Sequence, residues 1–373
     1  MNVQEILSRF HSVAANPSAQ KDAYLAAGKK IVLTAPVYTP EEIIHSMGLV
    51  PMGAWGADMQ LEKAKSYFPA FICSIMQSIV ELGMNGAYAG CSAIVIPSLC
   101  DSLKVLGQNW KYAVPEIPFI PMTYPQNRKP QFGHDFTVAG YKRVIADLES
   151  AAGVKFDEAK LAASIEVYDR HNAVMRELAA LLGEHCEITN AARSDVFKSA
   201  WFMLKEEHTA LCEELIVALK AEKPCTGGVK IMTSGILADA PALLDILDEC
   251  GMHIAADDVA AESRQYRTDA PADGAPLDRL AAKFCAMDNC SVLYDAEKKR
   301  VEMIVDEAKR SGAKAVLVVL TKFCDPEEFD YPLIKKACDS ADIPCALIEV
   351  DRQMRNYEQA RTAIETLKAI IEQ

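Results

Sequence analysis

The stretch Ala315-Val316-Leu317-Val318-Val319-Leu320-Thr321-Lys322-Phe323-Cys324-Asp325-Pro326-Glu327-Glu328 decides the fold class. Its unbroken run of Val and Leu is typical of a β-strand buried on both faces of a parallel sheet. A helix is predicted next, because Asp325 is a good N-cap, Pro326 suits the first helical position and two glutamates stand in the first turn. Cys324 is therefore expected where the strand ends, at the sheet edge where open α/β folds bind ligands.

An earlier stretch repeats this arrangement. Ser92-Ala93-Ile94-Val95-Ile96-Pro97-Ser98-Leu99-Cys100-Asp101-Ser102-Leu103 is again an apolar strand that ends in Cys-Asp and leads into a helix. The order of the surrounding elements also matches, which indicates a duplicated unit. Cys100 and Cys324 then take equivalent places in two halves of one chain.

The apolar pattern divides the chain into four parts. Residues 1–28 are predicted as a helical lead-in, 29–132 as a first α/β domain, 133–225 as a helical segment and 226–373 as a second α/β domain. Alternating strands and helices indicate parallel sheets with helical crossovers. The predicted fold is therefore α/β, with two similar parallel-sheet domains of the flavodoxin or Rossmann type joined by a helical segment.

Composition and charge restrict the class of protein. The chain has 373 residues, half of them hydrophobic, a formal charge of -13 and no cluster of Lys or Arg. This acidic balance argues against binding to nucleic acid. No apolar run is long enough for a membrane span, and the first residues lack the pattern of a signal peptide, so a cytoplasmic protein is expected.

The chain has twelve cysteines, and no two of them are spaced as Cys-x-x-Cys. Zinc knuckles, thioredoxin-type pairs and ferredoxin-type cluster motifs therefore have no support in the sequence. A cytosolic setting also argues against disulfides. Any metal bound by cysteines here must be held by residues that the fold brings together.

Three local predictions concern polar residues and one cysteine. Thr39-Pro40-Glu41-Glu42 has the pattern of a capping box at the start of a helix. A helix over residues 66–82 is expected to carry Cys73 on an apolar face. A strand over 252–256 is predicted to end before Asp257-Asp258, and Arg264 and Arg267 are expected in a solvated, salt-bridged loop rather than in a phosphate or carboxylate site.

Cys100 and Cys324, with Cys73 as a third thiol, form the candidate site. Thiolates favour iron–sulfur clusters, Cu(I) and zinc, and a cubane held by three cysteines leaves one iron with an exchangeable position. The helices that follow Cys100 and Cys324 would direct backbone N–H groups towards the sulfur atoms. The plainer alternative is that each cysteine is a small buried hydrophobic residue, as most free cysteines are.

The equivalent positions of Cys100 and Cys324 favour the ligand hypothesis for these two, whereas Cys73 has no such support by itself. Cys285 and Cys290 form a weaker rival pair. The cysteines in ordinary periodic segments are expected to be core or surface residues: Cys212, Cys250, Cys338 and Cys345. The sequence lacks both Gly-x-Gly-x-x-Gly and a P-loop, so no nucleotide site is predicted, and any ATP would be handled by a partner.

Several motifs resemble those of one enzyme family, in order along essentially the whole chain. They are Pro36-Val37-Tyr38-Thr39-Pro40-Glu41-Glu42-Ile43-Ile44-His45, Phe68-Pro69-Ala70-Phe71-Ile72-Cys73-Ser74, Leu99-Cys100-Asp101-Ser102-Leu103 with Gln108-Asn109-Trp110-Lys111, Ala256-Asp257-Asp258 with Glu262-Ser263-Arg264-Gln265, and Lys322-Phe323-Cys324-Asp325-Pro326-Glu327-Glu328. Together they resemble the β subunit of the (R)-2-hydroxyacyl-CoA dehydratases. That family includes 2-hydroxyglutaryl-, lactoyl-, phenyllactoyl- and 2-hydroxyisocaproyl-CoA dehydratases and is related to benzoyl-CoA reductase.

The resemblance implies an αβ heterodimer in which each subunit holds one [4Fe-4S] cluster through three cysteines. Carried over to this chain, the ligands are Cys73, Cys100 and Cys324. A separate ATP-hydrolysing iron–sulfur activator would supply one electron, which the β cluster passes on, while the substrate-binding iron is assigned to the α subunit. No residue of this chain is therefore expected to be the general base.

The implied reaction removes water from a (R)-2-hydroxyacyl-CoA to give the (E)-2-enoyl-CoA in an anaerobic fermentation of amino acids. An electron added to the thioester carbonyl makes a ketyl radical that expels the α-hydroxide, and the β C–H then becomes far more acidic.

Two other functions stay open. One is a benzoyl-CoA-reductase-type subunit, and the other is an electron-transfer or double-cubane cluster protein without dehydratase activity. A cysteine-rich α/β protein without metal is a third hypothesis. The substrate's acyl group, direct contact with CoA and the fourth ligand of the cluster are not predicted.

Overall fold

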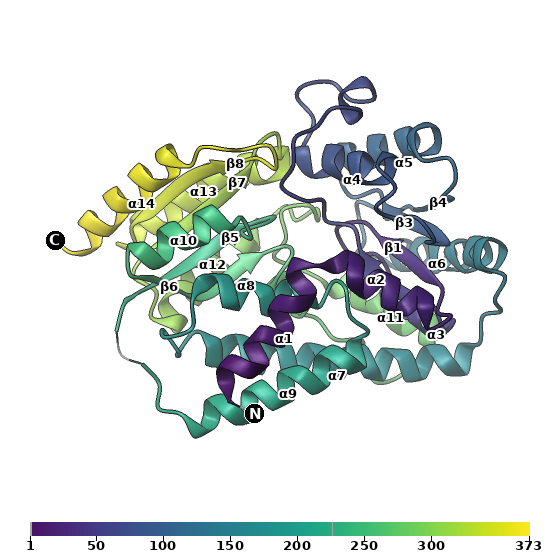
Figure 1. The fold of residues 1–373 in the computed structure, drawn as a ribbon, viewed down its shortest axis with the longest axis horizontal. Helices are drawn as coiled ribbons and strands as arrows, with labels where there is room; N and C mark the ends of the chain where they lie inside the picture. Colours follow the sequence, from purple (N-terminus) through teal and green to yellow (C-terminus); the bar gives the residue numbers. More distant parts are fainter. Residues whose placement is uncertain (1, 226) are drawn as a thin grey trace.

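The computed structural model describes residues 2–225 and 227–373 and consists of two sheet-containing parts beside a layer of long helices (Figure 1). The first part holds, in chain order, α1 (Val3–Ala15), α2 (Pro17–Ala26), β1 (Ile31–Thr34), α3 (Glu41–Ser46), β2 (Val50–Gly53), η1 (Ala64–Ser66), α4 (Ser74–Met84), β3 (Ala93–Pro97), α5 (Asp101–Ala113) and β4 (Phe119–Met122).

Long helices follow, and then a second sheet. The helices are α6 (Gln131–Ala152), α7 (Glu158–Leu182), α8 (Asn190–Ser199) and α9 (Lys205–Ala221). The second part holds β5 (Val229–Gly235), α10 (Pro241–Glu249), β6 (Met252–Val259), η2 (Ser263–Gln265), α11 (Pro276–Ala286), α12 (Lys299–Ser311), β7 (Val316–Thr321), α13 (Asp325–Ser340), β8 (Cys345–Val350) and α14 (Glu358–Ile371).

The two sheets share one topology. Their strand orders are β2-β1-β3-β4 and β6-β5-β7-β8, and all the strand pairs are parallel. Every residue of β3 and β7 is buried, as the unbroken apolar runs require. The prediction of two similar parallel-sheet domains is confirmed. In the first sheet β2 and β3 lie on opposite sides of β1, and in the second sheet β6 and β7 lie on opposite sides of β5. Cys100 and Cys324 therefore follow the strands at these topological switch points.

The N-terminal helix packs into the layer of long helices. Figure 1 shows α1 lying across α8 and α9, and its buried residues share a core with α7, α8 and α9. Phe10 in this core is fully buried. A larger core runs through both sheets without interruption. The predicted boundaries after residues 28, 132 and 225 stay a prediction.

Two local predictions are wrong, and one helix was not predicted. Thr39 is not the N-cap of α3, because its hydroxyl donates to the carbonyl of Ala35 at 2.9 Å and Pro40 takes the cap position. β6 runs on to Val259, so Asp257 and Asp258 lie inside the strand, where arginines neutralise both carboxylates. The helix α12 was missed, although its buried residues follow a helical spacing.

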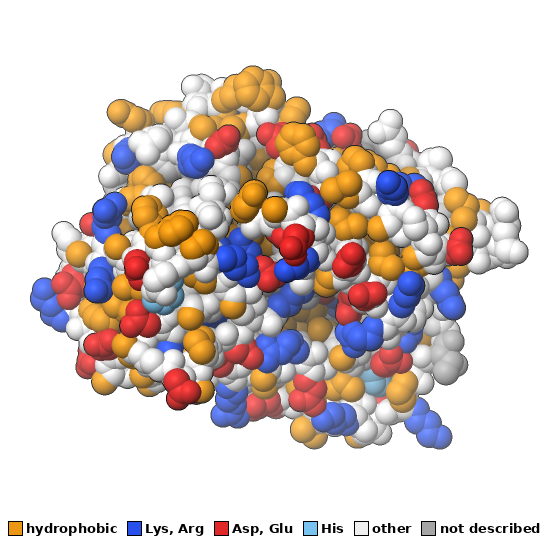
Figure 2. Space-filling view, turned by 180° about the vertical axis from the view of Figure 1, so that it is seen from behind, with side chains coloured by type: hydrophobic (Ala, Val, Ile, Leu, Met, Phe, Trp, Pro, Cys, Tyr) orange, Lys and Arg blue, Asp and Glu red, His pale blue; other side chains and the backbone are white. Residues whose placement is uncertain are grey.

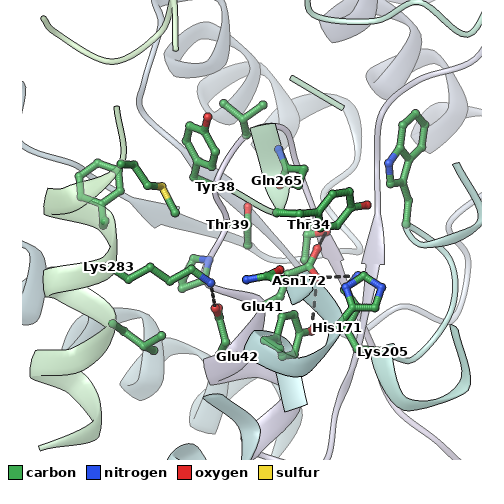
Figure 3. Close-up of a pocket in the computed structure, with 18 of the residues that line it drawn as sticks. Thr34, Tyr38, Thr39, Glu41, Glu42, His171, Asn172, Lys205, Gln265 and Lys283 are labelled. Atoms are coloured by element: carbon green, nitrogen blue, oxygen red, sulfur yellow. Dashed lines mark hydrogen bonds and ion pairs between the residues drawn. The ribbon is translucent and has the colours of Figure 1, made fainter. Parts of the chain in front are cut away.

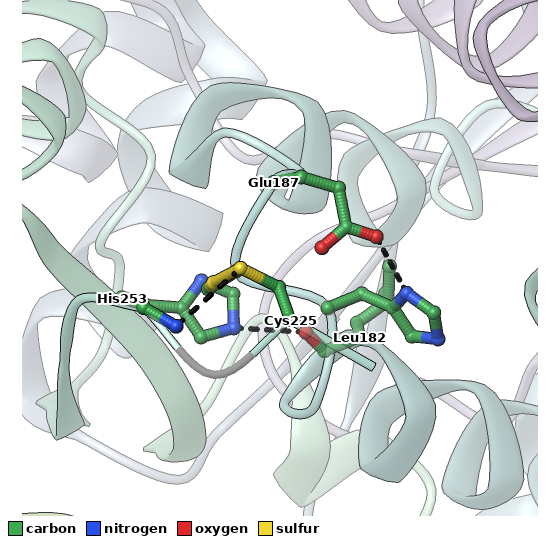
Figure 4. The surroundings of a disulfide bond; sticks show 7 residues. Leu182, Glu187, Cys225 and His253 are labelled. Carbon is green, nitrogen blue, oxygen red and sulfur yellow. Dashed lines mark hydrogen bonds and ion pairs between the residues drawn. A yellow bond between two sulfur atoms is a disulfide. The ribbon is translucent and has the colours of Figure 1, made fainter. Parts of the chain in front are cut away.

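The structure contains a disulfide between Cys186 and Cys225 (Figure 4), so the expectation of no disulfides is wrong. The turn after α7 and the segment before β5 bring the two Cα atoms to 5.4 Å, a separation that suits a disulfide. His253 lies close by and donates through Nε2 to the carbonyl of Leu182. The expectation came from the cellular compartment, which says nothing about whether two cysteines far apart in the sequence lie close together in the fold.

Figure 2 shows the face opposite to that of Figure 1. Basic and acidic side chains are interspersed there, and the described residues form no broad basic patch on this face. Among the helices formed by residues 2–225 and 227–373, none combines the length and the apolar character needed to cross a membrane.

Candidate metal centre

Cys73, Cys100 and Cys324 each occupy the N-cap position of a helix. They precede α4, α5 and α13 respectively, and none of the three thiols makes a side-chain capping hydrogen bond. Backbone N–H groups of the first turns nevertheless lie near enough to lower the pKa of the thiols: those of Ile75 and Met76 for Cys73, of Ser102 and Leu103 for Cys100, and of Glu327 for Cys324. Three helix N-termini thus direct positive partial charge towards the sulfurs.

The three thiols line one cavity of about 580 Å³. Its walls come from the starts of α4, α5 and α13 and from the loop over residues 291–296. Cys73 is buried, whereas Cys100 and Cys324 are partly exposed. The cavity therefore combines ligands from both halves of the chain in a space that is open to solvent on one side.

The spacing of the sulfur atoms discriminates between kinds of metal site. Three ligands on one tetrahedral zinc ion lie about 3.8 Å apart, because each Zn–S bond is about 2.3 Å long. The sulfur atoms of Cys73, Cys100 and Cys324 do not all lie within 4.8 Å of one another. In this arrangement the three sulfur atoms therefore do not form the tight set that one tetrahedral zinc ion requires.

Burial raises the pKa of all three thiols, that of Cys73 to about 12. The proximity of the thiols adds to the effect, since Cys73 and Cys100 raise the pKa of Cys324 further. Backbone N–H groups act in the opposite direction but are weaker than burial. Thiolates at this place require a strong positive charge, such as that of metal ions.

A buried ionic network holds the start of α13 behind Cys324. Glu327 accepts hydrogen bonds from Arg264 Nη2 at 3.0 Å, from Arg300 Nη2 at 2.7 Å and from Ser291 Oγ at 2.7 Å. Both arginines also donate to Asp258 on β6. The network thereby ties the cysteine-bearing turn to β6, α12 and the loop that lines the cavity.

Arg352 connects Cys73 with the second half of the chain. Its backbone N–H donates to Ser74 Oγ at 3.0 Å, next to Cys73. Its guanidinium forms ion pairs with Asp58 at 2.9 Å and with Asp239 at 3.0 Å. These contacts set the position of α4 relative to β8, so the third thiol is placed by tertiary contacts.

Comparison with known proteins identifies the family. The family model described as "2-hydroxyglutaryl-CoA dehydratase, D-component" matches residues 36–371. The chain belongs to this family. The match covers nearly all of both sheet-containing parts and the helices between them.

Curated members of the dehydratase family resemble this chain along its whole length. It is 45% identical over 367 residues to "(R)-phenyllactyl-CoA dehydratase beta subunit" of Clostridium sporogenes and 42% identical over 370 residues to "Lactoyl-CoA dehydratase subunit beta" of Anaerotignum propionicum, with 98% of each chain covered in both cases. It is 37% identical, also at 98% coverage, to "(R)-2-hydroxyglutaryl-CoA dehydratase, subunit beta" of Acidaminococcus fermentans. A benzoyl-CoA reductase component of Thauera aromatica is 25% identical over 352 residues, 91% of each chain.

The structure corrects the local setting of the three cysteines. Cys73 is not inside a helix over 66–82, since α4 begins only at Ser74 and a short 3-10 turn precedes it. Cys100 and Cys324 lie three residues beyond their strands, and Cys324 rather than Asp325 is the N-cap of α13. All three cysteines are N-caps of helices, and this shared position could have been sought in the sequence. The apolar residues around Cys73 concealed it, because they resemble an uninterrupted helix.

The other cysteines lie away from this cavity. Of the rival pair, Cys290 is buried beside Arg264, whose Nη1 lies 3.7 Å from its sulfur, and Cys285 is half-buried on α11. Neither lines the cavity of the three thiols. Cys212, Cys250 and Cys338 are buried and Cys345 is partly buried, in agreement with core or surface roles.

The expectation of a solvated loop around Arg264 and Arg267 is wrong. Arg264 is 4% exposed and belongs to the ionic network described above, and Arg267 donates to Asp258 at 2.8 Å. Both guanidinium groups form ion pairs with carboxylates of the protein itself. Sequence reasoning also missed Arg300, because the helix α12 that carries it was not predicted.

Proposed function

We propose that this chain is the β subunit of a (R)-2-hydroxyacyl-CoA dehydratase, a lyase that removes water to form the (E)-2-enoyl-CoA. The observation that carries the proposal is the meeting of Cys73, Cys100 and Cys324, each at a helix N-terminus, in one cavity. Three of the curated relatives bear names of dehydratase β subunits. The soft donor set of three thiols supports a [4Fe-4S] cluster as the bound group.

In this proposal the three cysteines hold the cluster, which supplies transfer of one electron when it is bound. The residues of the chain provide its surroundings. The N–H groups at the starts of α4, α5 and α13 offset the negative charge of thiolate ligands. The buried Glu327 network keeps Cys324 in register with the rest of the site. Hydrogen bonds and burial of this kind set the potential of a cluster.

We further propose that an α subunit and an ATP-hydrolysing iron–sulfur activator are the partners. The names of the relatives as β subunits support an assembly with a second kind of subunit. Exposed aromatic side chains at the cavity, Tyr294, Phe323 and Phe329, supply apolar area of the kind found in protein interfaces. The chain would act with its partners on a (R)-2-hydroxyacyl-CoA in the cytoplasm.

The degree of similarity favours a dehydratase over a benzoyl-CoA-reductase-type subunit. Identity to the three dehydratase β subunits is 37–45%, whereas identity to the reductase component is 25%. Assays of the αβ complex with activator and ATP, one with (R)-phenyllactyl-CoA or lactoyl-CoA and one with benzoyl-CoA, would show which chemistry occurs. Formation of the enoyl-CoA supports the dehydratase, and reduction of benzoyl-CoA without dehydration would replace it with the reductase.

The test of the metal centre is the iron and acid-labile sulfide content of the chain, co-expressed with its α partner and purified without oxygen. The two subunits would be separated before the measurement. We expect about four irons per β chain in the wild type and loss of most of them in Cys324→Ala. The matched control is Cys345→Ala, because Cys345 begins β8 outside the cavity and its loss should leave the iron unchanged.

Two results would overturn the assignment of the ligands. One is a wild-type chain without iron, and the other is equal iron in Cys324→Ala and in Cys345→Ala. Circular dichroism of each variant separates loss of the cluster from loss of the fold.

A further inference from the structure

A second pocket lies beside the cavity of the three thiols and contains no cysteine (Figure 3). It has a volume of about 80 Å³ and forms where the start of α3 meets α7, α9 and α11. Val37 lines both spaces, so a single loop separates them. The function proposed above makes no use of this pocket.

Two ion pairs contribute charges to the pocket wall. Lys283 on α11 binds Glu42 with Nζ at 2.7 Å from Oε1, and Lys205 on α9 lies 3.1 Å from Glu41 Oε2. Lys283 and Glu42 are both buried. The two cations and two anions cancel, and a ligand with a net charge would leave a buried charge without compensation. The pocket therefore favours a ligand with no net charge.

His171 lines this pocket and carries an acceptor without a partner among the described residues. Its neighbour His208 contacts the carbonyl of Val196 through Nε2 at 2.9 Å, and a carbonyl only accepts, so His208 Nε2 carries a proton. Both imidazoles are neutral, since burial lowers the pKa of each. His208 Nδ1 is then an acceptor for the N–H of His171 Nε2 at 3.0 Å.

The remaining ring nitrogen, His171 Nδ1, carries no proton and has no hydrogen-bond partner among the described residues. The side chain is fully buried and lines the pocket. A buried acceptor of this kind requires a donor. His171 is one of the residues that line the pocket, so a molecule bound there can supply this donor.

Donors are also left over on the pocket wall. The amide of Asn172 gives one N–H to Asp269 Oδ1 at 3.0 Å, and that of Gln265 gives one to the carbonyl of Ala260. Each amide nitrogen carries a second hydrogen. Figure 3 shows the Lys283–Glu42 pair and the His171 ring on opposite sides, with Asn172 between them.

We propose that this pocket binds a small zwitterion with the chemistry of an α-amino acid. Its ammonium group would donate to His171 Nδ1 and Glu41, and its carboxylate would accept from Lys283 and the free amide hydrogens. Because one water needs about 10–15 Å³ in this measure of volume, 80 Å³ holds roughly five to eight heavy atoms. The stacked rings of Trp55 and Trp201, 5.0 Å apart, supply an apolar wall for the side chain.

The experiment is isothermal titration calorimetry of the αβ complex with three probes of similar size. L-alanine is the zwitterion, propionate lacks the ammonium group and ethylamine lacks the carboxylate. We expect saturable binding of L-alanine and binding at least tenfold weaker for the two charged probes. Equal binding of propionate or ethylamine, or no binding of L-alanine, would refute the proposal and leave a pocket that holds water.

His171→Phe tests the acceptor. Phenylalanine keeps the ring in place, and His208 Nδ1 still has the thiol of Cys212 at 3.3 Å as a donor. Binding of L-alanine should weaken about ten- to hundredfold, as loss of one buried hydrogen bond requires. His134→Phe is the control, since His134 lies outside the pocket, and equal affinities of the two variants would contradict the assigned role of His171. The iron content serves as an independent readout, because it should be the same in both variants.

Discussion

Asp258 is fully buried and accepts hydrogen bonds from three guanidinium groups. Arg264 Nε lies at 3.0 Å, Arg267 Nη1 at 2.8 Å and Arg300 Nε at 2.7 Å. Burial raises the pKa of Asp258, but the three arginines more than offset this effect and hold it well below its usual range. A single carboxylate thus binds cations from the loop around η2 and from α12, and Glu327 shares two of these partners, Arg264 and Arg300.

Asp258→Asn should destabilise the protein by about 3–5 kcal/mol, because it leaves buried arginines without their full compensation. The measurement is the free energy of unfolding in urea, followed by circular dichroism. As a control, Asp339→Asn breaks an exposed pair with Lys335 and should cost less than about 1 kcal/mol. Similar losses in the two variants would show that the buried network adds little stability.

At the scale of elements, the packing of α7 against α9 depends on two neutral histidines. His171 on α7 and His208 on α9 face one another, and their rings are 5.2 Å apart. Burial is the main cause of the lowered pKa in both, and that of His208 falls to about 3. The unfolded chain binds these protons near pH 6.5, whereas the folded chain excludes them.

The stability of the protein should therefore fall as the pH drops below about 6.5. Each histidine accounts for about 1.4 kcal/mol per pH unit once the pH is well below 6.5, since the unfolded state alone gains the proton in this range. Thermal unfolding at pH 7.5, 6.5 and 5.5 tests this. The double variant His171→Phe/His208→Gln should show a smaller decrease, and an unchanged pH dependence would assign the effect to other groups.

At the scale of the whole molecule, the segment between the two sheets is closed on itself by the Cys186–Cys225 disulfide. The bridge spans 39 positions and encloses α8 and α9 (Figures 1 and 4). These helices, together with α1 and α7, form a core of their own. The bridge thus restricts the unfolded chain in the segment that joins the two sheet-containing parts.

Reduction of this disulfide by a dithiol should lower the stability by up to about 4 kcal/mol, the entropy of closing a loop of this length. Melting temperatures with and without dithiothreitol, both without oxygen, measure the effect. The double variant Cys186→Ser/Cys225→Ser should melt at one temperature in both conditions, while Cys250→Ser should respond like the wild type. No response of the wild type would mean that the bridge does not restrict the unfolded chain.

Local patterns in the sequence determined the α/β class and its duplication. The strand–turn–helix units at 92–103 and 315–328 depend on neighbours a few positions apart, which is why Cys100 and Cys324 could be selected from the sequence as equivalent. Cys73 entered the candidate site as a third thiol without support of its own, and only the family resemblance assigned it as a ligand. Its apolar surroundings resemble an uninterrupted helix and concealed the cap.

Only the tertiary structure decided which distant groups meet. Asp258 is neutralised by arginines from another helix and a loop. Cys186 and Cys225 form a disulfide across two helices. The carbonyl of Val196 on α8 fixes the proton of His208, and this in turn leaves His171 Nδ1 without one. Residue spacing encodes the period of a helix or strand, because that period arises from the backbone of adjacent residues. It does not encode contacts between elements, because these depend on how whole faces pack, and the candidate site is made of such contacts.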